Sequence, residues 1–208
     1  MTTSAPTTEK ATTLPRWKAP GVFIGQFIEE PRVIGAVAPS SSRMARLMLE
    51  GLDLANASAV LEYGPGTGAF TVEILRRLGP RTRFVAIEVN PRMAAMMRHR
   101  FPHVRLLEES VENARSICDG EGIASADVIV SGLPWTMFDE ALQRRILDGV
   151  KAVLRPGGVF VTFAYTFTAM MPAGRRFVRL MREYFPRVER SRIEWRNIPP
   201  AAVLRGTM

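Results

Sequence analysis

Cysteine is almost absent from this 208-residue chain, which contains Cys118 and no second thiol. A single cysteine cannot form an internal disulfide, and no motif around Cys118 supplies the other ligands that a metal ion would need. We therefore expect Cys118 to be a core thiol in a protein of a reducing compartment. We expect no metal site.

Long apolar runs are also missing. No segment approaches the roughly 18 to 20 apolar residues that a helix needs to cross a bilayer. The N-terminal stretch MTTSAPTTEKATTLPR lacks the charged and then apolar order of a secretion signal, so we expect a cytoplasmic protein. The same residues, 1–16, have almost nothing to bury. They predict a disordered tail ahead of one domain over residues 17–208.

Lysine is scarce, whereas arginine supplies 25 of the 28 basic residues and the net charge is +8. Such an excess indicates an anionic partner, either nucleic acid or an acidic lipid surface. Arginine forms bidentate hydrogen bonds with phosphate groups, although the base composition of a genome also enriches arginine without a functional reason. Charge alone leaves the choice between the two partners open.

Apolar strands alternate with amphipathic helices along most of the domain, which indicates right-handed crossovers and a parallel sheet covered on both faces. The last two predicted strands, 187–195 and 201–208, are separated by a connection too short for a crossover helix, so we expect an antiparallel hairpin at the sheet edge. The predicted fold class is α/β, with a mostly parallel sheet of seven strands. The other predicted strands span 59–63, 83–89, 104–107, 126–131 and 158–165, and helices are expected at 40–52, 67–78, 91–101 and 138–154.

A glycine-rich turn follows the first predicted strand in the sequence VLEYGPGTGAF. Glycine is needed where the backbone turns tightly and a ligand must approach it closely. Glu88 ends the next strand about twenty residues on, where an acid can accept both hydroxyls of a ribose. After the third strand, Glu109 and Ser110 are placed to reach an adenine edge. The order of the glycines differs from the fingerprint of dinucleotide-binding proteins. The alternative is a purely structural role, in which these acids cap helices.

Taken together, these features resemble motifs I and II of the class I S-adenosylmethionine-dependent methyltransferases, over about residues 40–165. The resemblance implies a Rossmann-like fold and S-adenosylmethionine as cofactor. It also implies that Glu62 approaches the methionine amino group and that Glu88 holds the ribose. The cofactor-binding residues it implies are Glu62, Tyr63, Gly64, Gly66, Thr67, Gly68, Glu88, Val89, Glu109 and Ser110.

The fourth strand breaks off into Ser131-Gly132-Leu133-Pro134-Trp135. This strand is expected beside the first, across the point where the strand order reverses, so the break lies next to the reactive methyl group. Amine methyltransferases often carry Asn or Asp and then a proline-aromatic pair here. The stretch VLEYGPGTGAFT resembles ribosomal RNA adenine dimethyltransferases, but Ser131 stands where that family has asparagine. An RNA adenine N-methyltransferase is therefore the alternative function, and no nucleic-acid partner is expected.

A second resemblance covers nearly all of residues 22–205. The segments FIEEPRVIGAVAPSSSRMARLM, SGLPW and RNIPPAAVLR together resemble bacterial phospholipid N-methyltransferases. This resemblance implies successive methylation of phosphatidylethanolamine toward phosphatidylcholine, at the inner face of the cell membrane. The partners it implies are phosphatidylethanolamine, its methylated derivatives and an anionic membrane surface.

Methyl transfer to an amine requires mainly alignment and exclusion of water, so no covalent nucleophile is needed. Aromatic faces suit the methylated ammonium, and Trp135, Tyr165 and Tyr63 are candidates for such a cage, with core packing as the alternative. The catalytic candidates are Ser131, Gly132, Trp135 and Tyr165, and the substrate-binding candidates are Ser40, Ser41, Tyr165, Arg196 and Asn197. The two serines serve equally well as helix caps.

Two segments are suited to docking on a bilayer. The first is an amphipathic helix at about 17–30, which is also a candidate lid over the methyl donor. The second spans 175–196 and carries eight arginines against three glutamates. Its apolar stripe is at Phe177, Leu180, Met181 and Tyr184. We expect this stripe to pack on the sheet, as the helices of this fold must.

Overall fold

The structure is a computed structural model in which residues 42–208 are described. Four sequence predictions fall outside these residues: the tail at 1–16, the leading helix at about 17–30, and the two substrate candidates Ser40 and Ser41.

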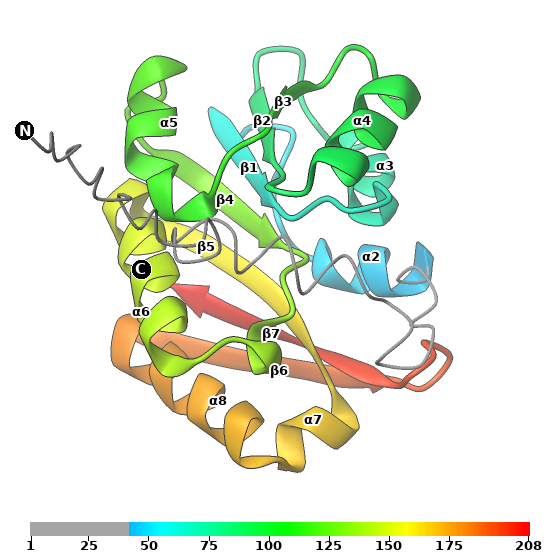
Figure 1. Ribbon diagram of the computed structural model, residues 1–208, viewed down its shortest axis with the longest axis vertical. Coiled ribbons are helices and arrows are strands. Elements are labelled where there is room, and N and C mark those ends of the chain that lie inside the picture. Colours follow the sequence, from blue (N-terminus) through cyan, green and yellow to red (C-terminus); the bar gives the residue numbers. More distant parts are fainter. Residues whose placement is uncertain (1–41) are drawn as a thin grey trace, which may run out of the picture.

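One seven-stranded sheet forms the centre of the molecule, with the strand order β3-β2-β1-β4-β5-β7-β6 (Figure 1). The pairs among the first five strands are all parallel, and β7 runs antiparallel to both β5 and β6. The predicted fold class, including the antiparallel C-terminal hairpin, is therefore confirmed. The strands are β1 (Ala59–Tyr63), β2 (Arg83–Ile87), β3 (Arg105–Leu107), β4 (Ala126–Ser131), β5 (Leu154–Tyr165), β6 (Arg187–Glu194) and β7 (Ala201–Thr207).

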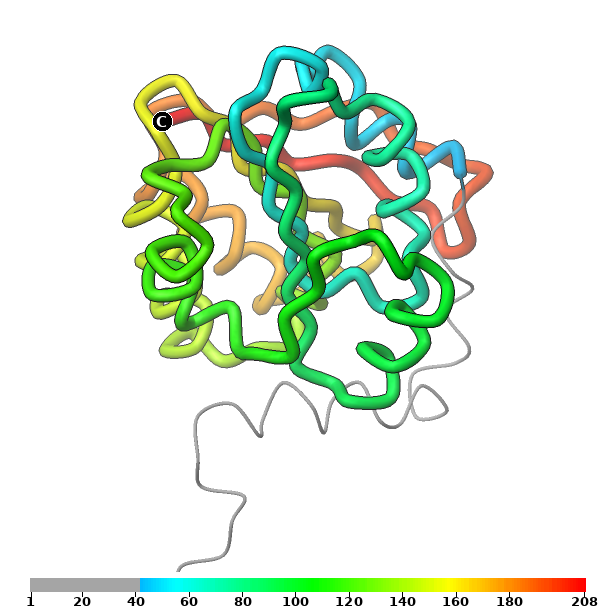
Figure 2. The backbone as a smooth tube through the Cα atoms, turned by 90° about the horizontal axis from the view of Figure 1, so that it is seen from above, coloured from blue at the N-terminus to red at the C-terminus, as the bar shows by residue number. Residues whose placement is uncertain are grey.

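Helices cover both faces of this sheet, as two perpendicular views show (Figures 1 and 2). α2, α3 and α4 lie on one side, and α5, α6 and α8 lie on the other. The short α7 follows the end of β5. The helices are α2 (Ser42–Met48), α3 (Ala69–Leu75), α4 (Pro91–Arg100), α5 (Ala114–Gly120), α6 (Glu140–Val153), α7 (Thr166–Met170) and α8 (Pro172–Tyr184), with 3-10 turns η2 (Val111–Asn113) and η3 (Trp135–Met137).

Burial on both faces explains why the central strands read as continuous apolar runs. In β1, Val60 packs toward α2 and α3, whereas Leu61 and Tyr63 pack toward α5 and α6. Cys118 is fully buried in the same cluster as Leu61 and Tyr63, which confirms the expectation of a core thiol. Both faces of β1 are thus occupied, and only its carboxyl end is left to meet a ligand.

α6 shows how the local sequence defines an element. Asp139 caps its start, because its carboxylate accepts a hydrogen bond of 2.7 Å from the Leu142 N–H. The apolar stripe that predicted the helix is buried at Leu142, Ile146 and Val150, whereas Ala141 is exposed. The helix ends where the chain enters β5 at Leu154.

α8 buries Phe177, Leu180 and Met181 against the sheet, so the stripe in the basic C-terminal segment is part of the core, as expected. It is not free to enter a bilayer. Between residues 42 and 208, no helix has the length and the apolar character to cross a membrane.

We predict that Phe177→Ala lowers the free energy of unfolding by about 3 to 5 kcal/mol, because it leaves a cavity beside Trp135 in the core. Chemical denaturation followed by circular dichroism measures this change. Phe167→Ala is the matched control: its side chain is 50% exposed, so its loss is below about 1 kcal/mol. Equal losses at the two positions would contradict the placement of α8.

Candidate functional site

The candidate site lies at the carboxyl ends of β1, β2 and β4. β1 pairs with β2 on one side and with β4 on the other, so the loops that leave these three strands emerge side by side. The strand order also reverses between β1 and β4, which is where open α/β sheets bind their ligands. The three loops contain most of the predicted cofactor residues.

The glycine-rich turn after β1 depends on backbone conformations that favour glycine. Gly64, Gly66 and Gly68 have φ angles of 66°, 54° and 81°. A Cβ atom at Gly64 would lie 2.7 Å from the Leu133 side chain, and one at Gly68 would clash with the Phe101 ring. A Cβ atom at Gly66 would meet nothing within 4 Å. The turn is therefore packed at both ends and open in the middle, where a ligand can approach the backbone.

Glu62, at the end of β1, is a fully buried carboxyl group with one unused oxygen. Its Oε2 accepts a 2.7 Å hydrogen bond from the Thr71 hydroxyl, whereas its Oε1 has no partner among the described residues. Burial raises the pKa of Glu62 to about 8. A buried acceptor without a donor is costly, so this oxygen suits a ligand that brings an amine.

Glu88 links the second strand to the glycine turn. It is 1% exposed, its Oε2 accepts from the Gly66 N–H at 3.1 Å, and its Oε1 accepts from the Asn90 N–H at 2.9 Å. Burial raises the pKa of this carboxyl as well. The carboxylate thus lies at the open middle of the turn, where the sequence predicts the ribose hydroxyls.

A narrow cleft continues from this point between the loops that follow β1, β2, β3 and β4. Glu109 is exposed beside the cleft, and its Oε1 accepts from the Ser110 N–H and the Asn113 side chain. Ser110 is engaged differently from the prediction, because its hydroxyl caps η2 through the Glu112 N–H. The residues that line the cleft are Gly64, Ile87, Glu88, Val89, Glu109, Val111 and Leu133.

Two of the predicted cofactor residues contribute backbone rather than side chain to the site. The Thr67 carbonyl accepts a 2.6 Å hydrogen bond from Arg100, which holds the turn against α4. The Tyr63 ring is fully buried in the core cluster that includes Cys118, and its hydroxyl has no partner among residues 42–208. Tyr63 therefore cannot line an aromatic cage, and that interpretation was wrong.

Trp135 is also a core residue, which corrects its prediction as a cover for the methylated amine. Its indole is 2% exposed and stacks on Phe177 with ring centroids 4.7 Å apart. Its Nε1–H donates a 3.0 Å hydrogen bond to the Ser131 hydroxyl. The Ser131 carbonyl accepts from the Thr162 hydroxyl at 3.0 Å. Ser131 therefore holds the loop in place from within the core, and its side chain is not presented to a methyl-accepting substrate.

Gly132 is the contact point between the loop after β4 and the glycine turn. Its N–H donates to the Tyr63 carbonyl at 2.8 Å, and a Cβ atom at this position would lie 2.6 Å from the Gly64 carbonyl oxygen. Only glycine allows this approach. Within residues 42–208, no hydrogen bond to the Gly132 carbonyl is found.

Sequence reasoning missed the residue that anchors this loop from behind. Gln143, in α6, is fully buried, and its side-chain amide donates to the Trp135 carbonyl. Its Oε1 accepts from Arg176, which also donates to the Phe138 carbonyl at 2.9 Å. The available signal was a glutamine inside the apolar stripe of α6, since a buried amide needs partners.

The remaining substrate candidates lie at the carboxyl end of β5. Tyr165 is partly exposed there and stacks on Phe167. The turn between β6 and β7 approaches it, because Ala201 is the β7 partner of Tyr165. Arg196 is exposed in this turn, but Asn197 is 2% exposed and its amide donates to the Pro199 carbonyl. Asn197 therefore shapes the turn, which corrects its prediction as a substrate-binding residue.

Comparison with known proteins agrees with this geometry. A family model described as a methyltransferase domain matches residues 60–158. An ornithine lipid N-methyltransferase of Singulisphaera acidiphila is 34% identical over 79% of this chain and 97% of its own length. A ribosomal RNA small subunit methyltransferase A of Thermotoga petrophila is 26% identical over 54% of this chain and 41% of its own length. Among solved structures, an O-methyltransferase from Bacillus cereus in complex with S-adenosylhomocysteine superposes with a TM-score of 0.65, at 16% identity, over 91% of this chain and 90% of that one.

The described site fits S-adenosylmethionine, which is the cofactor of this chain. The unpartnered Glu62 oxygen suits the amino group of the cofactor, and the Glu88 carboxylate suits its ribose hydroxyls. Between them, the open centre of the glycine turn leaves room for the part of the cofactor that lies against the protein backbone. The roles of the individual residues remain predictions.

We predict that Glu88→Ala weakens the binding of S-adenosylhomocysteine by roughly 1 to 3 kcal/mol, because the ribose hydroxyls lose their acceptor. Isothermal titration calorimetry measures this change. The exposed Glu108, which pairs with Arg98 at 3.0 Å, provides the matched control Glu108→Ala. Unchanged affinity in Glu88→Ala would show that the end of β2 does not hold the cofactor.

A second prediction concerns pH. The folded-state pKa of Glu62, about 8, lies above its usual 4.5, so its stabilising contribution is complete below about pH 4.5 and is lost as the pH rises through 8. For the cofactor-free protein, we expect this group to lower the free energy of unfolding by on the order of 1 kcal/mol per pH unit between these values. Urea denaturation at several pH values should show a shallower decline in Glu62→Gln. The burial of Glu88 acts in the same direction, so the decline is reduced rather than abolished.

If wild type and Glu62→Gln declined in parallel, Glu62 would be ionised throughout that range. That result would contradict the desolvation of this carboxyl group at the end of β1.

Proposed function

This chain belongs to the class I S-adenosylmethionine-dependent methyltransferases, in the family of the ornithine lipid N-methyltransferase, and from that premise we propose that it methylates the amine of a membrane lipid. The proposed acceptor is phosphatidylethanolamine, with successive transfers toward phosphatidylcholine. The observation that carries the lipid assignment is the 34% identity to the ornithine lipid enzyme over nearly all of that enzyme's length.

The site provides what such a reaction needs from the protein. S-adenosylmethionine supplies an electrophilic methyl group. The chain supplies a fixed and largely dry junction, because the loop after β4 is held against the glycine turn at Gly132 and anchored from behind by Gln143. Alignment and exclusion of water are the main contributions to a displacement of this kind.

We infer that the Gly132 carbonyl orients the acceptor amine. It lies next to the glycine turn, and a carbonyl oxygen accepts a hydrogen bond from an amine without titrating. Tyr165 is the one predicted cage residue whose ring stays partly exposed at this edge of the sheet. We assign it to the methylated ammonium, for which an aromatic face contributes about 0.5 to 2 kcal/mol.

Phosphatidylethanolamine and an ornithine lipid share the chemistry that this site would read. Each carries a primary amine on a short flexible chain, near an oxyanion and joined to acyl chains. The resemblance of SGLPW and RNIPPAAVLR to phospholipid N-methyltransferases favours phosphatidylethanolamine, and the curated relative favours the ornithine lipid. We also propose that the protein acts at the inner face of the cell membrane, where it binds peripherally.

The experiment is a transfer assay with the full chain and S-adenosylmethionine labelled in its methyl group. Separate reactions contain phosphatidylethanolamine vesicles, ornithine lipid vesicles, ribosomal RNA or phosphatidylcholine vesicles alone. We expect label in phosphatidylethanolamine, with Glu88→Ala as the impaired control. Label confined to the ornithine lipid would show that the acceptor is this lipid and not phosphatidylethanolamine. Label confined to RNA would overturn the proposal.

A further inference from the structure

Large apolar side chains that remain exposed are gathered in one part of the described chain. Seven such side chains occur among residues 42–208, and five of them lie on α7, directly after it at Met171, or in the turn between β6 and β7. These five are Phe167, Met170, Met171, Trp195 and Ile198, with exposed fractions of 50%, 80%, 52%, 71% and 76%. We call them the apolar tip. Single exposed apolar residues are common on soluble proteins, but a group of this size indicates an interaction surface.

The two parts of the apolar tip are joined by the fold. The Thr166 N–H, at the start of α7, donates to the Pro200 carbonyl at 2.9 Å, and the Thr166 hydroxyl donates to the same oxygen. Tyr165 is the register partner of Ala201. α7 and the β6–β7 turn therefore lie side by side at the carboxyl end of β5 (Figure 1). Parallel strands end at a common edge, so this is also the edge that carries the candidate site.

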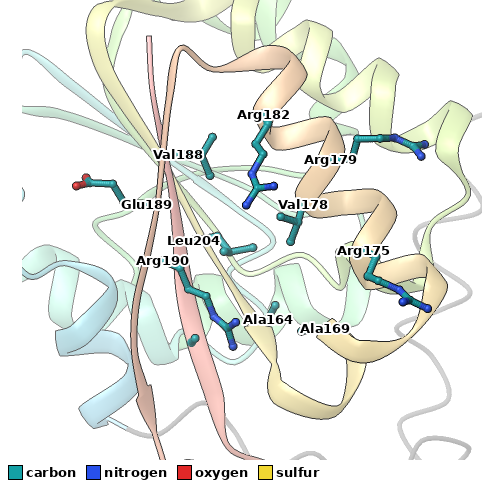
Figure 3. A pocket seen from close by; sticks show the side chains of 11 residues that line it. Ala164, Ala169, Arg175, Val178, Arg179, Arg182, Val188, Glu189, Arg190 and Leu204 are labelled. Carbon is teal, nitrogen blue, oxygen red and sulfur yellow. The ribbon is translucent and has the colours of Figure 1, made fainter.

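A basic groove lies beside this tip, between α8 and β6 (Figure 3). Its floor is apolar and includes Ala164, Val178 and Leu204, and its volume is about 480 Å³. Arg182 reaches over it from α8 and Arg190 from β6. Arg175, Arg182 and Arg190 form no ion pair within residues 42–208. By contrast, Arg144, Arg145 and Arg179, on α6 and α8, pair with glutamates.

The combination of surfaces favours one class of partner. A nucleic acid would use the arginines but would leave the exposed methionines and Trp195 in water. An apolar protein surface would bury the tip but would leave the arginines without counter-charges. An anionic lipid bilayer satisfies both, since basic residues meet phosphate groups while neighbouring apolar side chains enter the boundary between headgroups and acyl chains.

We propose that the apolar tip and the α8–β6 groove form one docking surface for an anionic phospholipid bilayer. Met170, Trp195 and Ile198 enter the boundary layer, and Arg182 and Arg190 bind lipid phosphates. Arg182, Arg190 and Trp195 belong to the segment 175–196 that the sequence suggested, but the apolar stripe of α8 is buried and the exposed apolar side chains come from the apolar tip instead. The leading helix, the other suggested segment, lies outside the described residues. The inference rests on the proposed function in one respect: docking here would turn the carboxyl edge of the sheet, with its acceptor site, toward the lipid.

The test is co-sedimentation of the full chain with phosphatidylcholine vesicles that contain or lack phosphatidylglycerol, without cofactor. We expect binding to the anionic vesicles, weakened about tenfold or more in Met170→Ser/Trp195→Ser/Ile198→Ser and in Arg182→Gln/Arg190→Gln. The control for the tip is Leu75→Ser/Met96→Ser, at the two exposed apolar positions elsewhere. The control for the cations is Arg81→Gln/Arg92→Gln, at exposed arginines for which no ion pair is described.

The proposal is overturned if the test variants bind as wild type does, if the control variants lose as much, or if the arginine variant loses equally on neutral vesicles. Circular dichroism confirms that each variant is folded. Methyl transfer to detergent-dispersed lipid separates this inference from the proposed function. If docking is the only defect, the tip and groove variants keep that activity and lose transfer to vesicles, whereas failure of the function would abolish both in wild type.

Discussion

The close approach of two loops at the carboxyl edge of the sheet is the constraint on which the rest of the site depends. The Gly132 amide donates to the Tyr63 carbonyl, and the space between Gly132 and the Gly64 carbonyl admits no side-chain carbon. Leu133 then covers the other face of Gly64. β1 and β4 are paired strands, so the two loops that follow them leave the sheet side by side and meet directly. This contact places the glycine turn beside the loop after β4, residues 131–135, which we call the acceptor loop after its proposed role.

A buried polar network holds the acceptor loop in that position. It passes from the Thr162 hydroxyl through Ser131 to the Trp135 indole, and Gln143 contacts the Trp135 carbonyl from α6. Buried polar groups that are fully paired define a single arrangement, because any alternative leaves a donor or an acceptor unsatisfied. The aromatic residue of SGLPW therefore has a packing role here, and the group that we propose to orient the acceptor amine is a backbone carbonyl, that of Gly132.

The excess of arginine divides into two populations in the structure. Many arginines form short exposed ion pairs, such as Arg105 with Glu121 at 2.7 Å and Arg145 with Glu112 at 2.6 Å. Such exposed pairs contribute little to stability and leave no net charge to attract a partner. Around the α8–β6 groove, Arg179 is paired with glutamates, but Arg175, Arg182 and Arg190 have no ion-pair partner in the described part of the chain, so three positive charges there are free to meet a ligand. Net charge indicated an anionic partner, but pairing decides where that partner can bind.

The sequence by itself determined the alternation of strands and helices, the antiparallel hairpin, the glycine turn and the acids at the ends of β1 and β2. These features follow from local periodicity and from backbone conformations that only glycine adopts easily. Only the tertiary structure decided that Trp135 and Tyr63 point into the core, that Asn197 closes a turn, and that Gln143 supports the acceptor loop. The direction of a side chain at a strand end depends on which helix packs beside it, and that contact joins residues far apart in the chain. The exposure of Trp195 and Ile198 has the same origin, because no local pattern distinguishes an apolar residue that is covered from one that is not.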